Sequence, residues 1–122
     1  MNRIKLLIFV ASLVTSLFIV FGDTMTRMGV LMDAACGARV AANAEKTAAH
    51  TVACALMDSC RASGYGLILK GQFLKFDQPG DTQALKLLKA SRTRDNVTVK
   101  VTGTFSETNI KVLRIRVAKT AH

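Results

Sequence analysis

The sequence predicts a small, mainly β domain of the α+β class, preceded by an apolar N-terminal segment. Three observations carry this prediction: an alanine-rich stretch without proline at about 37–62, pairs of short β-prone runs after residue 65, and an uncharged apolar run near the N-terminus. Helix-forming and strand-forming segments that are separated along the chain are typical of this class. With 122 residues, the chain holds one domain at most.

Residues 1–22 predict a signal peptide or an N-terminal membrane anchor. The segment begins with MNRIK, continues with LLIFVASLVTSLFIVF and ends at GDT. A basic start, an apolar stretch and a polar exit are typical of secretory signals, and the apolar run also approaches the roughly 17 residues that span a bilayer. We therefore expect residues 23–122 to form a periplasmic or secreted domain. If the segment is not cleaved, it anchors that domain to the inner membrane, and this is the only membrane contact we expect.

The first half of this domain predicts one strand and a helical insert. Residues 27–33 alternate apolar with small or polar positions, which is the pattern of a strand. The stretch at about 37–62 is alanine-rich and predicts helix, with a kink or loop near His50, where threonines lower the propensity. The following GLILKGQFLKFD predicts a hairpin that turns at Lys70-Gly71.

The second half predicts a short helix and a second hairpin. QPGDTQALKLLKAS has apolar residues on one helical side, and Asp81 or Thr82 is its expected N-cap. NVTVKV alternates strictly, and the apolar phase of the last run switches between Val112 and Leu113, which indicates a bulge or sharp bend. Without the insert, the order is three strands, a helix and two strands, as in the five-stranded OB-fold barrel. An open α+β sheet is the alternative.

The chain also resembles a group of uncharacterised small exported bacterial proteins with an OB-like domain. The resemblance covers most of residues 23–122 and rests on GVLMDAAC, a histidine before CALMDSC, SGYGL, KGQFLKFD and VTVKVTGTF. In that group an Asp-x-x-Cys closes the first strand and a histidine precedes two cysteines. The matching positions here are Asp33, Cys36, His50, Cys54 and Cys60, although Cys54 and Cys60 are spaced more widely than the pair in the group. The resemblance implies an OB-like fold and no particular activity.

Cysteine and histidine are concentrated in one region and predict a metal site. The candidate ligands are Cys36, His50, Cys54 and Cys60, and thiolate with imidazole suits zinc or copper(I). His50 and Cys54 are four residues apart, so they share a face if this segment is helical. Cys60 joins them only if the helix ends in between, for which Asp58-Ser59 is the candidate break.

A disulfide is the main alternative use of the cysteines. Exported cysteines are disulfides by default, and Cys36 to Cys60 or Cys54 to Cys60 would fasten the insert to the strands and leave one thiol over. A redox-active thiol is the third interpretation. Nucleophilic catalysis also needs a group that orients the histidine, and only Asp33 or Asp58 is available. The chain has no glycine-rich phosphate loop and no paired-carboxylate cluster, so we expect a non-enzymatic binding or accessory protein whose partner is another protein or a small ligand.

The charge suggests a second binding function. The formal net charge is +9, and a basic exported domain is attracted to anionic surfaces. Lys100, Arg114 and Arg116 lie on predicted strands, and the last two share a face because they are two residues apart. We therefore expect a basic face that binds a polyanion, such as a glycan or an anionic surface, as the alternative function. Nucleic acid is disfavoured because few aromatic residues remain for base stacking.

Overall fold

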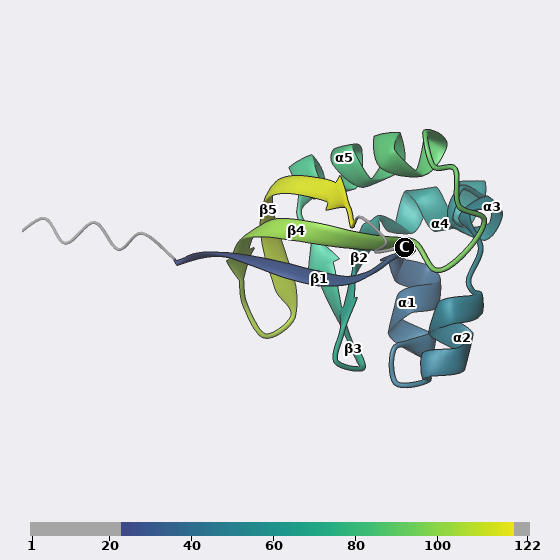
Figure 1. Cartoon of the computed structure of the whole chain (residues 1–122), viewed down its shortest axis with the longest axis horizontal. Helices are drawn as coiled ribbons and strands as arrows, with labels where there is room; N and C mark the ends of the chain where they lie inside the picture. The colour runs from purple at the N-terminus through teal and green to yellow at the C-terminus, as the bar shows by residue number, and fades with distance from the viewer. Residues whose placement is uncertain (1–22, 119–122) are drawn as a thin grey trace, which may run out of the picture.

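The computed structural model describes residues 23–118. The predicted signal or anchor segment, residues 1–22, and residues 119–122 lie outside the described part. The elements in chain order are β1 (Thr24–Asp33), α1 (Ala34–Val40), α2 (Ala44–Ala49), α3 (Val52–Ala55), α4 (Asp58–Ser63), β2 (Tyr65–Leu69), β3 (Gln72–Phe76), α5 (Gln78–Lys89), β4 (Thr98–Phe105) and β5 (Asn109–Val117) (Figure 1). This order confirms the α+β class and the helical insert between the first two strands.

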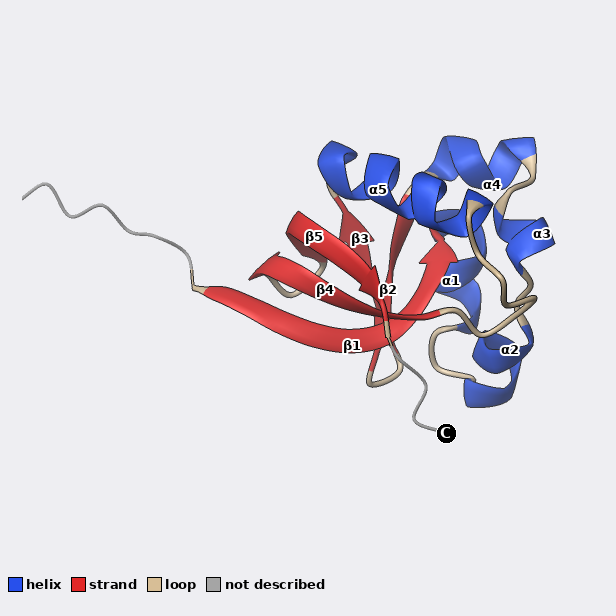
Figure 2. Ribbon diagram, turned by 45° about the horizontal axis from the view of Figure 1, so that its top comes forward, coloured by secondary structure: helices blue, strands red, loops and turns tan. Residues whose placement is uncertain are grey.

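The five strands form one mixed sheet. Its hydrogen-bonded order is β1-β2-β3-β5-β4, and the ring of pairings closes because β1 also pairs with β4. The pair formed by β3 and β5 is parallel, and the other four pairs are antiparallel. Helices α1 to α4 gather beside one end of the sheet, whereas α5 lies across another side of it (Figure 2).

Strand β1 joins two sides of the sheet. Residues 24–30 pair with β4, and residues 30–33 pair with β2. Near the crossover a Cβ on Gly29 would press into the carbonyl oxygen of Ile68 and the side chain of Leu67, so the close strand approach requires glycine there. The predicted strand is confirmed and begins three residues earlier than expected. The last residue of β1 is Asp33, which also belongs to the candidate site.

Both predicted hairpins are present. Lys70 and Gly71 have φ of 50° and 76°, and two consecutive positive values make the tight turn that matches the twist of β2 and β3. In the second hairpin Thr102 pairs with Arg114 while Gly103 pairs with Val112. Leu113 is thus the extra, unpaired residue of a β-bulge. The switch of apolar phase in the sequence predicted the bulge at this place.

The predicted cap of α5 is wrong. Asp77 is the N-cap, and its Oδ1 accepts hydrogen bonds from the backbone nitrogens of Gly80 and, on β5, Val112. Asp81 lies within the helix, and its Oδ1 instead accepts from the backbone nitrogen of Tyr65 at 2.8 Å. Both carboxylates therefore tie α5 to strands, which is a tertiary role that local spacing does not reveal.

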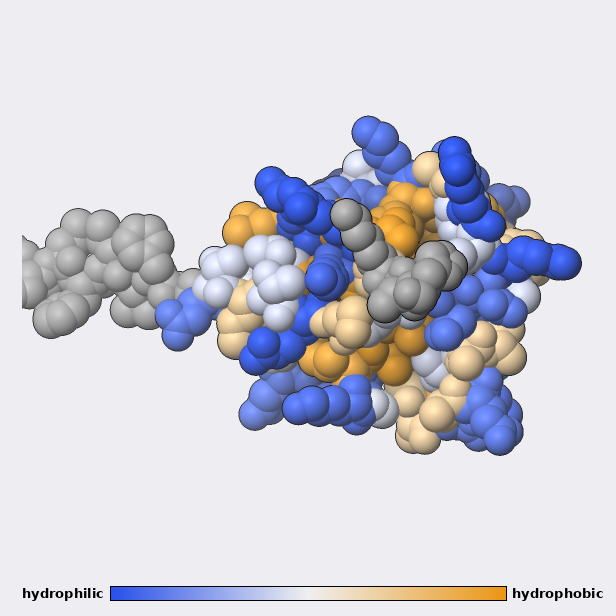
Figure 3. Space-filling model, in the orientation of Figure 1, coloured by the Kyte–Doolittle hydropathy of each residue, from blue (hydrophilic) through white to orange (hydrophobic). Residues whose placement is uncertain are grey.

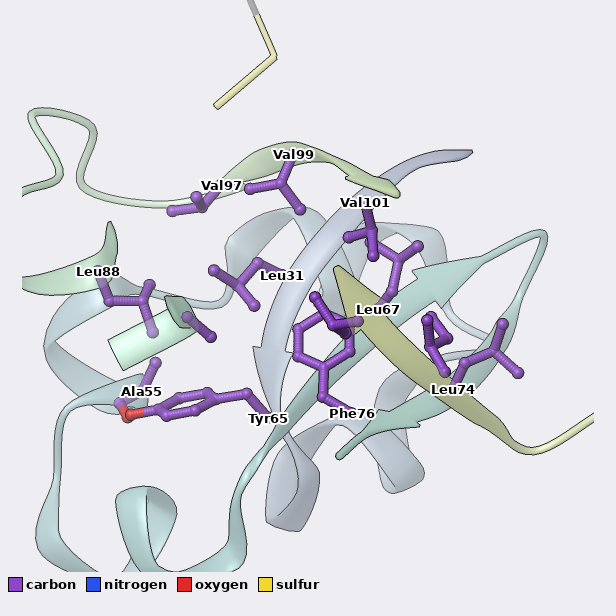
Figure 4. Close-up of a cluster of buried hydrophobic side chains, with 13 residues drawn as sticks. Leu31, Ala55, Tyr65, Leu67, Leu74, Phe76, Leu88, Val97, Val99 and Val101 are labelled. Atoms are coloured by element: carbon purple, nitrogen blue, oxygen red, sulfur yellow. The ribbon is translucent and has the colours of Figure 1, made fainter. Parts of the chain in front are cut away.

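The main core lies inside the sheet and under α5. Figure 4 shows Leu31, Leu67, Val99 and Val101 pointing toward one another from three strands, with Leu88 of α5 at one side. Further members of the cluster include Tyr65 and Phe76, with 2% and 3% of their surface exposed. A second, smaller cluster contains Met32, Ala41 and Ile68. It attaches the insert to the sheet and so helps to fix the helices that carry the site.

Candidate functional site

Four short helices bring the predicted ligands together. Cys36 lies in the first turn of α1, His50 ends α2, Cys54 lies in α3 and Cys60 in α4. The expected interruption near His50 is present. The break between Cys54 and Cys60 is also present, but it falls at residues 56–57, just before the predicted Asp58-Ser59. Because the chain turns at each break, residues that one long helix would place on different faces converge.

Side-chain caps set the start of two of these helices, α1 and α3. The Oδ2 of Asp33 accepts a hydrogen bond from the backbone nitrogen of Cys36 at 3.0 Å, and the Oγ1 of Thr51 accepts one from the backbone nitrogen of Cys54 at 3.1 Å. Such caps satisfy amide groups that a helix N-terminus leaves without a partner. The residue that starts each helix therefore also fixes the position of a cysteine in its first turn.

The three cysteines form the centre of the site. Their Sγ atoms all lie within 4.8 Å of one another, and none is in a disulfide. Tetrahedral zinc with Zn–S bonds of about 2.3 Å needs sulfurs about 3.8 Å apart, so a small contraction would satisfy a metal ion. A disulfide would require two of the sulfurs to approach much further, to about 2.05 Å, and that alternative stays a prediction.

Asp33 and His50 form a second group that shares Cys36. One ligand atom from each of Asp33, Cys36 and His50 also lies within 4.8 Å of the others. Among residues 23–118 no group of this kind joins His50 to all three cysteines. The predicted set of four ligands is thus brought to one corner, as two overlapping triads rather than as one preformed tetrahedron.

The Asp33–His50 contact is the most unusual feature of this corner. Asp33 is fully buried, the His50 side chain is 10% exposed, and the Oδ1 and Nε2 atoms are 3.0 Å apart. The two atoms are close enough for an ion pair, and neither of them forms a hydrogen bond within the described chain. Buried polar atoms are normally satisfied, and each exception calls for an explanation such as an ion or a catalytic role. The pair is therefore a candidate for contact with an ion or for a catalytic role.

Burial makes two of the thiols hard to ionise without a cation. It raises the pKa of Cys60 to about 11, and the nearby Asp33 charge adds to this increase. Burial also raises the pKa of Cys54, and neighbouring Cys36 adds to that shift. Desolvation disfavours the charged form of a thiol, and so do nearby negative charges. A metal ion that binds these sulfurs has to displace their protons, so binding becomes pH-dependent.

Arg39 is a site residue that the sequence interpretation missed. Its Nη2 donates to the Sγ of Cys36 at 3.6 Å, and its Nε donates to the carbonyl oxygen of Ala35. The available signal was the spacing of three residues between Cys36 and Arg39, which places two side chains side by side on a helix. Asp33 was absent from the predicted ligand set as well, although its own spacing to Cys36 is that of a helix cap.

The predicted basic residues also share one face. Lys100 of β4 pairs with Arg116 of β5, Thr102 pairs with Arg114, and all three cations are exposed. Directly paired residues point to the same side of a sheet, so these charges form a small patch, which we call the β4–β5 basic face. Figure 3 shows hydrophilic side chains interspersed with apolar patches on one side of the molecule. The basic face and the cysteine corner are built from different elements.

In residues 23–118 no helix is long and apolar enough to cross a membrane. Comparison with protein-family profiles, curated proteins and solved structures finds no match to the chain.

Proposed function

We propose that this protein is an exported, non-enzymatic binding protein that holds a soft transition-metal ion at its cysteine corner. The observation that carries the proposal is the convergence of Cys36, Cys54 and Cys60 from three separate helices to within 4.8 Å. Thiolates are the protein ligands that select copper(I) and zinc. The basic and apolar start of the chain supports export.

An OB-like fold is part of this proposal. It is supported by the strand order β1-β2-β3-β5-β4 and by the position of α5 between β3 and β4. In this arrangement the insert occupies the connection between the first two strands. The resemblance to small exported bacterial proteins with an OB-like domain points in the same direction, because Asp33, Cys36, His50, Cys54 and Cys60 all belong to the corner.

Zinc and copper(I) make different demands on His50. Zinc requires a fourth ligand, so it would draw the His50 imidazole toward the three sulfurs. Copper(I) is satisfied by three thiolates and leaves His50 beside Asp33. Replacement of His50 therefore distinguishes the two ions, whereas replacement of Cys54 weakens both.

The test is metal uptake by the full chain, reduced and freed of metal. Native mass spectrometry after addition of zinc or copper(I), with competition from a coloured chelator, gives stoichiometry and affinity. We expect the wild-type protein to bind one ion per chain and the Cys54→Ser variant to bind none. His50→Ala should weaken zinc by at least about tenfold, the lower end for loss of even an indirect partner of a metal site, and leave copper(I) unchanged. Lys46→Ala, an exposed change on the same helix α2, is the matched control. Retention of neither ion by the reduced protein would refute the proposal.

Polyanion binding is the second candidate, favoured by the register that places Lys100 opposite Arg116 on the β4–β5 basic face. Neutralisation of an anionic partner's charges makes affinity fall steeply with salt. Binding of a heparin oligosaccharide should therefore weaken as salt rises and be lost in Arg114→Glu with Arg116→Glu. Lys46→Glu with Lys89→Glu changes net charge equally at exposed positions elsewhere and should retain binding. Salt-independent binding, or equal losses in the two double variants, would exclude this candidate.

A further inference from the structure

Cys36 differs from the other two cysteines in its surroundings. Cys60 is only 6% exposed, whereas Cys54 is partly exposed and so is Cys36. The Cys36 sulfur accepts a hydrogen bond from the Arg39 guanidinium at 3.6 Å. A cation beside a partly accessible sulfur is the setting in which cysteines are reactive, and buried cysteines without one are inert. The geometry therefore singles out one of three otherwise similar thiols.

His50 and Asp33 supply the rest of a thiol-activating arrangement. The imidazole lies in the same triad as the Cys36 sulfur, and the buried Asp33 carboxylate contacts it 3.0 Å from Nε2. A thiol next to a base that is oriented by a third group is the general form of an activated nucleophile. Asp33 is a positioning residue in this arrangement, because its Oδ1 contacts His50 and its Oδ2 accepts a hydrogen bond from the backbone nitrogen of Cys36.

Two more thiols lie close to the Cys36 thiol. The Sγ atoms of Cys54 and Cys60 each lie within 4.8 Å of the Cys36 Sγ. An accessible reactive cysteine with a second cysteine close by is the arrangement of redox-active sites, where the second thiol resolves the bond formed by the first. The second thiol is therefore supplied by the same chain.

We propose that the metal-free corner performs thiol–disulfide exchange, with Cys36 as the attacking sulfur and Cys54 or Cys60 as the resolving one. In the first step the Cys36 thiolate attacks an accessible disulfide, its S–S bond breaks, and one substrate thiolate leaves and takes up a proton. In the second step Cys54 or Cys60, losing its proton, attacks the Cys36 sulfur and expels the other substrate thiolate. Two protein thiols are oxidised to a disulfide, and one substrate disulfide is reduced to two thiols.

This inference goes beyond metal binding, since it uses the same thiols but requires no ion. The chemistry that is recognised is a disulfide bond, in either a small molecule or a protein. Glutathione disulfide represents the first source, and insulin, which carries exposed disulfides, represents the second. The probe that reacts faster with Cys36 shows whether a small-molecule disulfide or a protein disulfide is the preferred substrate.

The experiment follows a single turnover of the reduced, metal-free full chain by quenched-flow alkylation and mass spectrometry. We expect wild-type protein to become two hydrogens lighter and to retain one alkylatable thiol. The variant with Cys54→Ser and Cys60→Ser should stop at a mixed disulfide on Cys36. Arg39→Gln removes an exposed guanidinium and should slow the first step by about tenfold, as loss of one charge-assisted hydrogen bond predicts. Arg116→Gln, on the β4–β5 basic face, should react at the wild-type rate.

Three results would overturn the assignment. These are an initial adduct on Cys54 or Cys60, a Cys36→Ser variant that reacts as fast as wild type, and equal slowing by Arg39→Gln and Arg116→Gln. The last would mean that general attraction of an anionic probe, rather than the contact with the sulfur, sets the rate. Metal uptake is measured on the same samples before oxidation, so failure of exchange and failure of metal binding are observed separately.

Discussion

Replacement of Tyr65 by phenylalanine tests how firmly the sheet holds the insert. Tyr65 begins β2, is 2% exposed, and its hydroxyl donates to the carbonyl oxygen of Ala55 at 2.9 Å. Ala55 lies in α3 next to Cys54, so this hydrogen bond joins the core to the candidate site. The phenylalanine variant keeps the ring in place and removes only the oxygen.

The expected cost follows from the acceptor that is left behind. A buried carbonyl without a partner costs about 1–3 kcal/mol of unfolding free energy. With a urea m-value of about 1–2 kcal/mol/M for a domain of this size, the unfolding midpoint should fall by roughly 1 M. The measurement is urea denaturation of reduced, metal-free protein at neutral pH, followed by circular dichroism.

The same pair of proteins gives a pH dependence with a definite sign. Burial raises the pKa of Tyr65 in the folded state, whereas in the unfolded chain tyrosine titrates near about 10. The stabilisation by the protonated hydroxyl is therefore complete below pH about 10 and is lost as the pH rises through the raised value. The stability difference between wild type and Tyr65→Phe should narrow above pH 10, while other groups cancel in the comparison. A midpoint unchanged by the substitution at neutral pH, or a difference that widens in alkali, would refute this argument.

Three further predictions concern α5 and the metal site. Leu88→Ala, at a position 2% exposed, should lower the unfolding free energy by about 2–5 kcal/mol in chemical denaturation, whereas Leu88→Met should cost less than about 1.5 kcal/mol; similar losses would contradict close packing. Asp77→Ala removes the acceptor of two backbone hydrogen bonds and should lower the melting temperature. Asp77→Asn keeps an acceptor at this position, so its melting temperature should stay close to that of wild type. Equal decreases in the two variants would show that the charge of Asp77, rather than its role as a cap, is what stabilises the protein. Metal affinity, measured by chelator competition, should fall by at least about tenfold per pH unit on acidification because bound thiols release protons; binding independent of pH would exclude Cys60, whose pKa is raised to about 11, as a ligand.

Local sequence patterns were sufficient to predict a feature wherever a short segment determines its own backbone geometry. The turn at Lys70-Gly71 needs two positive φ values, and glycine at the second position makes one of them easy. The bulge at Leu113 follows from apolar alternation that changes phase, because side chains of a strand must alternate between the two faces. These features depend on neighbours in sequence, so the sequence alone indicates them.

The insert was predicted less completely, since helix propensity in an alanine-rich stretch is nearly uniform. Helix propensity alone therefore does not distinguish one or two long helices from four short ones. The number of breaks is set by caps at Asn43 and Thr51 and by the buried contact of His50 with Asp33. That contact joins the end of a strand to the end of a helix 17 residues later, and no local rule specifies it.

The site shows the same division between local and tertiary information. The sequence indicated which cysteines and histidine would come together, and it also indicated the need for a break between Cys54 and Cys60; that they bind a metal stays a prediction. The contacts of Arg39 with Cys36 and of Asp33 with His50 were not predicted, because their consequences depend on where the helices finally pack. The chemistry of the corner is therefore decided by the tertiary arrangement more than by the spacing.

The two functions proposed for the cysteine corner exclude each other at any moment. A disulfide brings two sulfurs to about 2.05 Å, whereas two ligands of one zinc ion stay about 3.8 Å apart. With only three cysteines in the chain, one disulfide leaves a single thiol and abolishes a three-sulfur site. Oxidation therefore releases a bound ion, and a bound ion protects the thiols from oxidation. Metal uptake measured on oxidised protein, or exchange measured on metal-loaded protein, would give a negative result even if both proposals were correct, so the redox state of each sample has to be established before either function is judged.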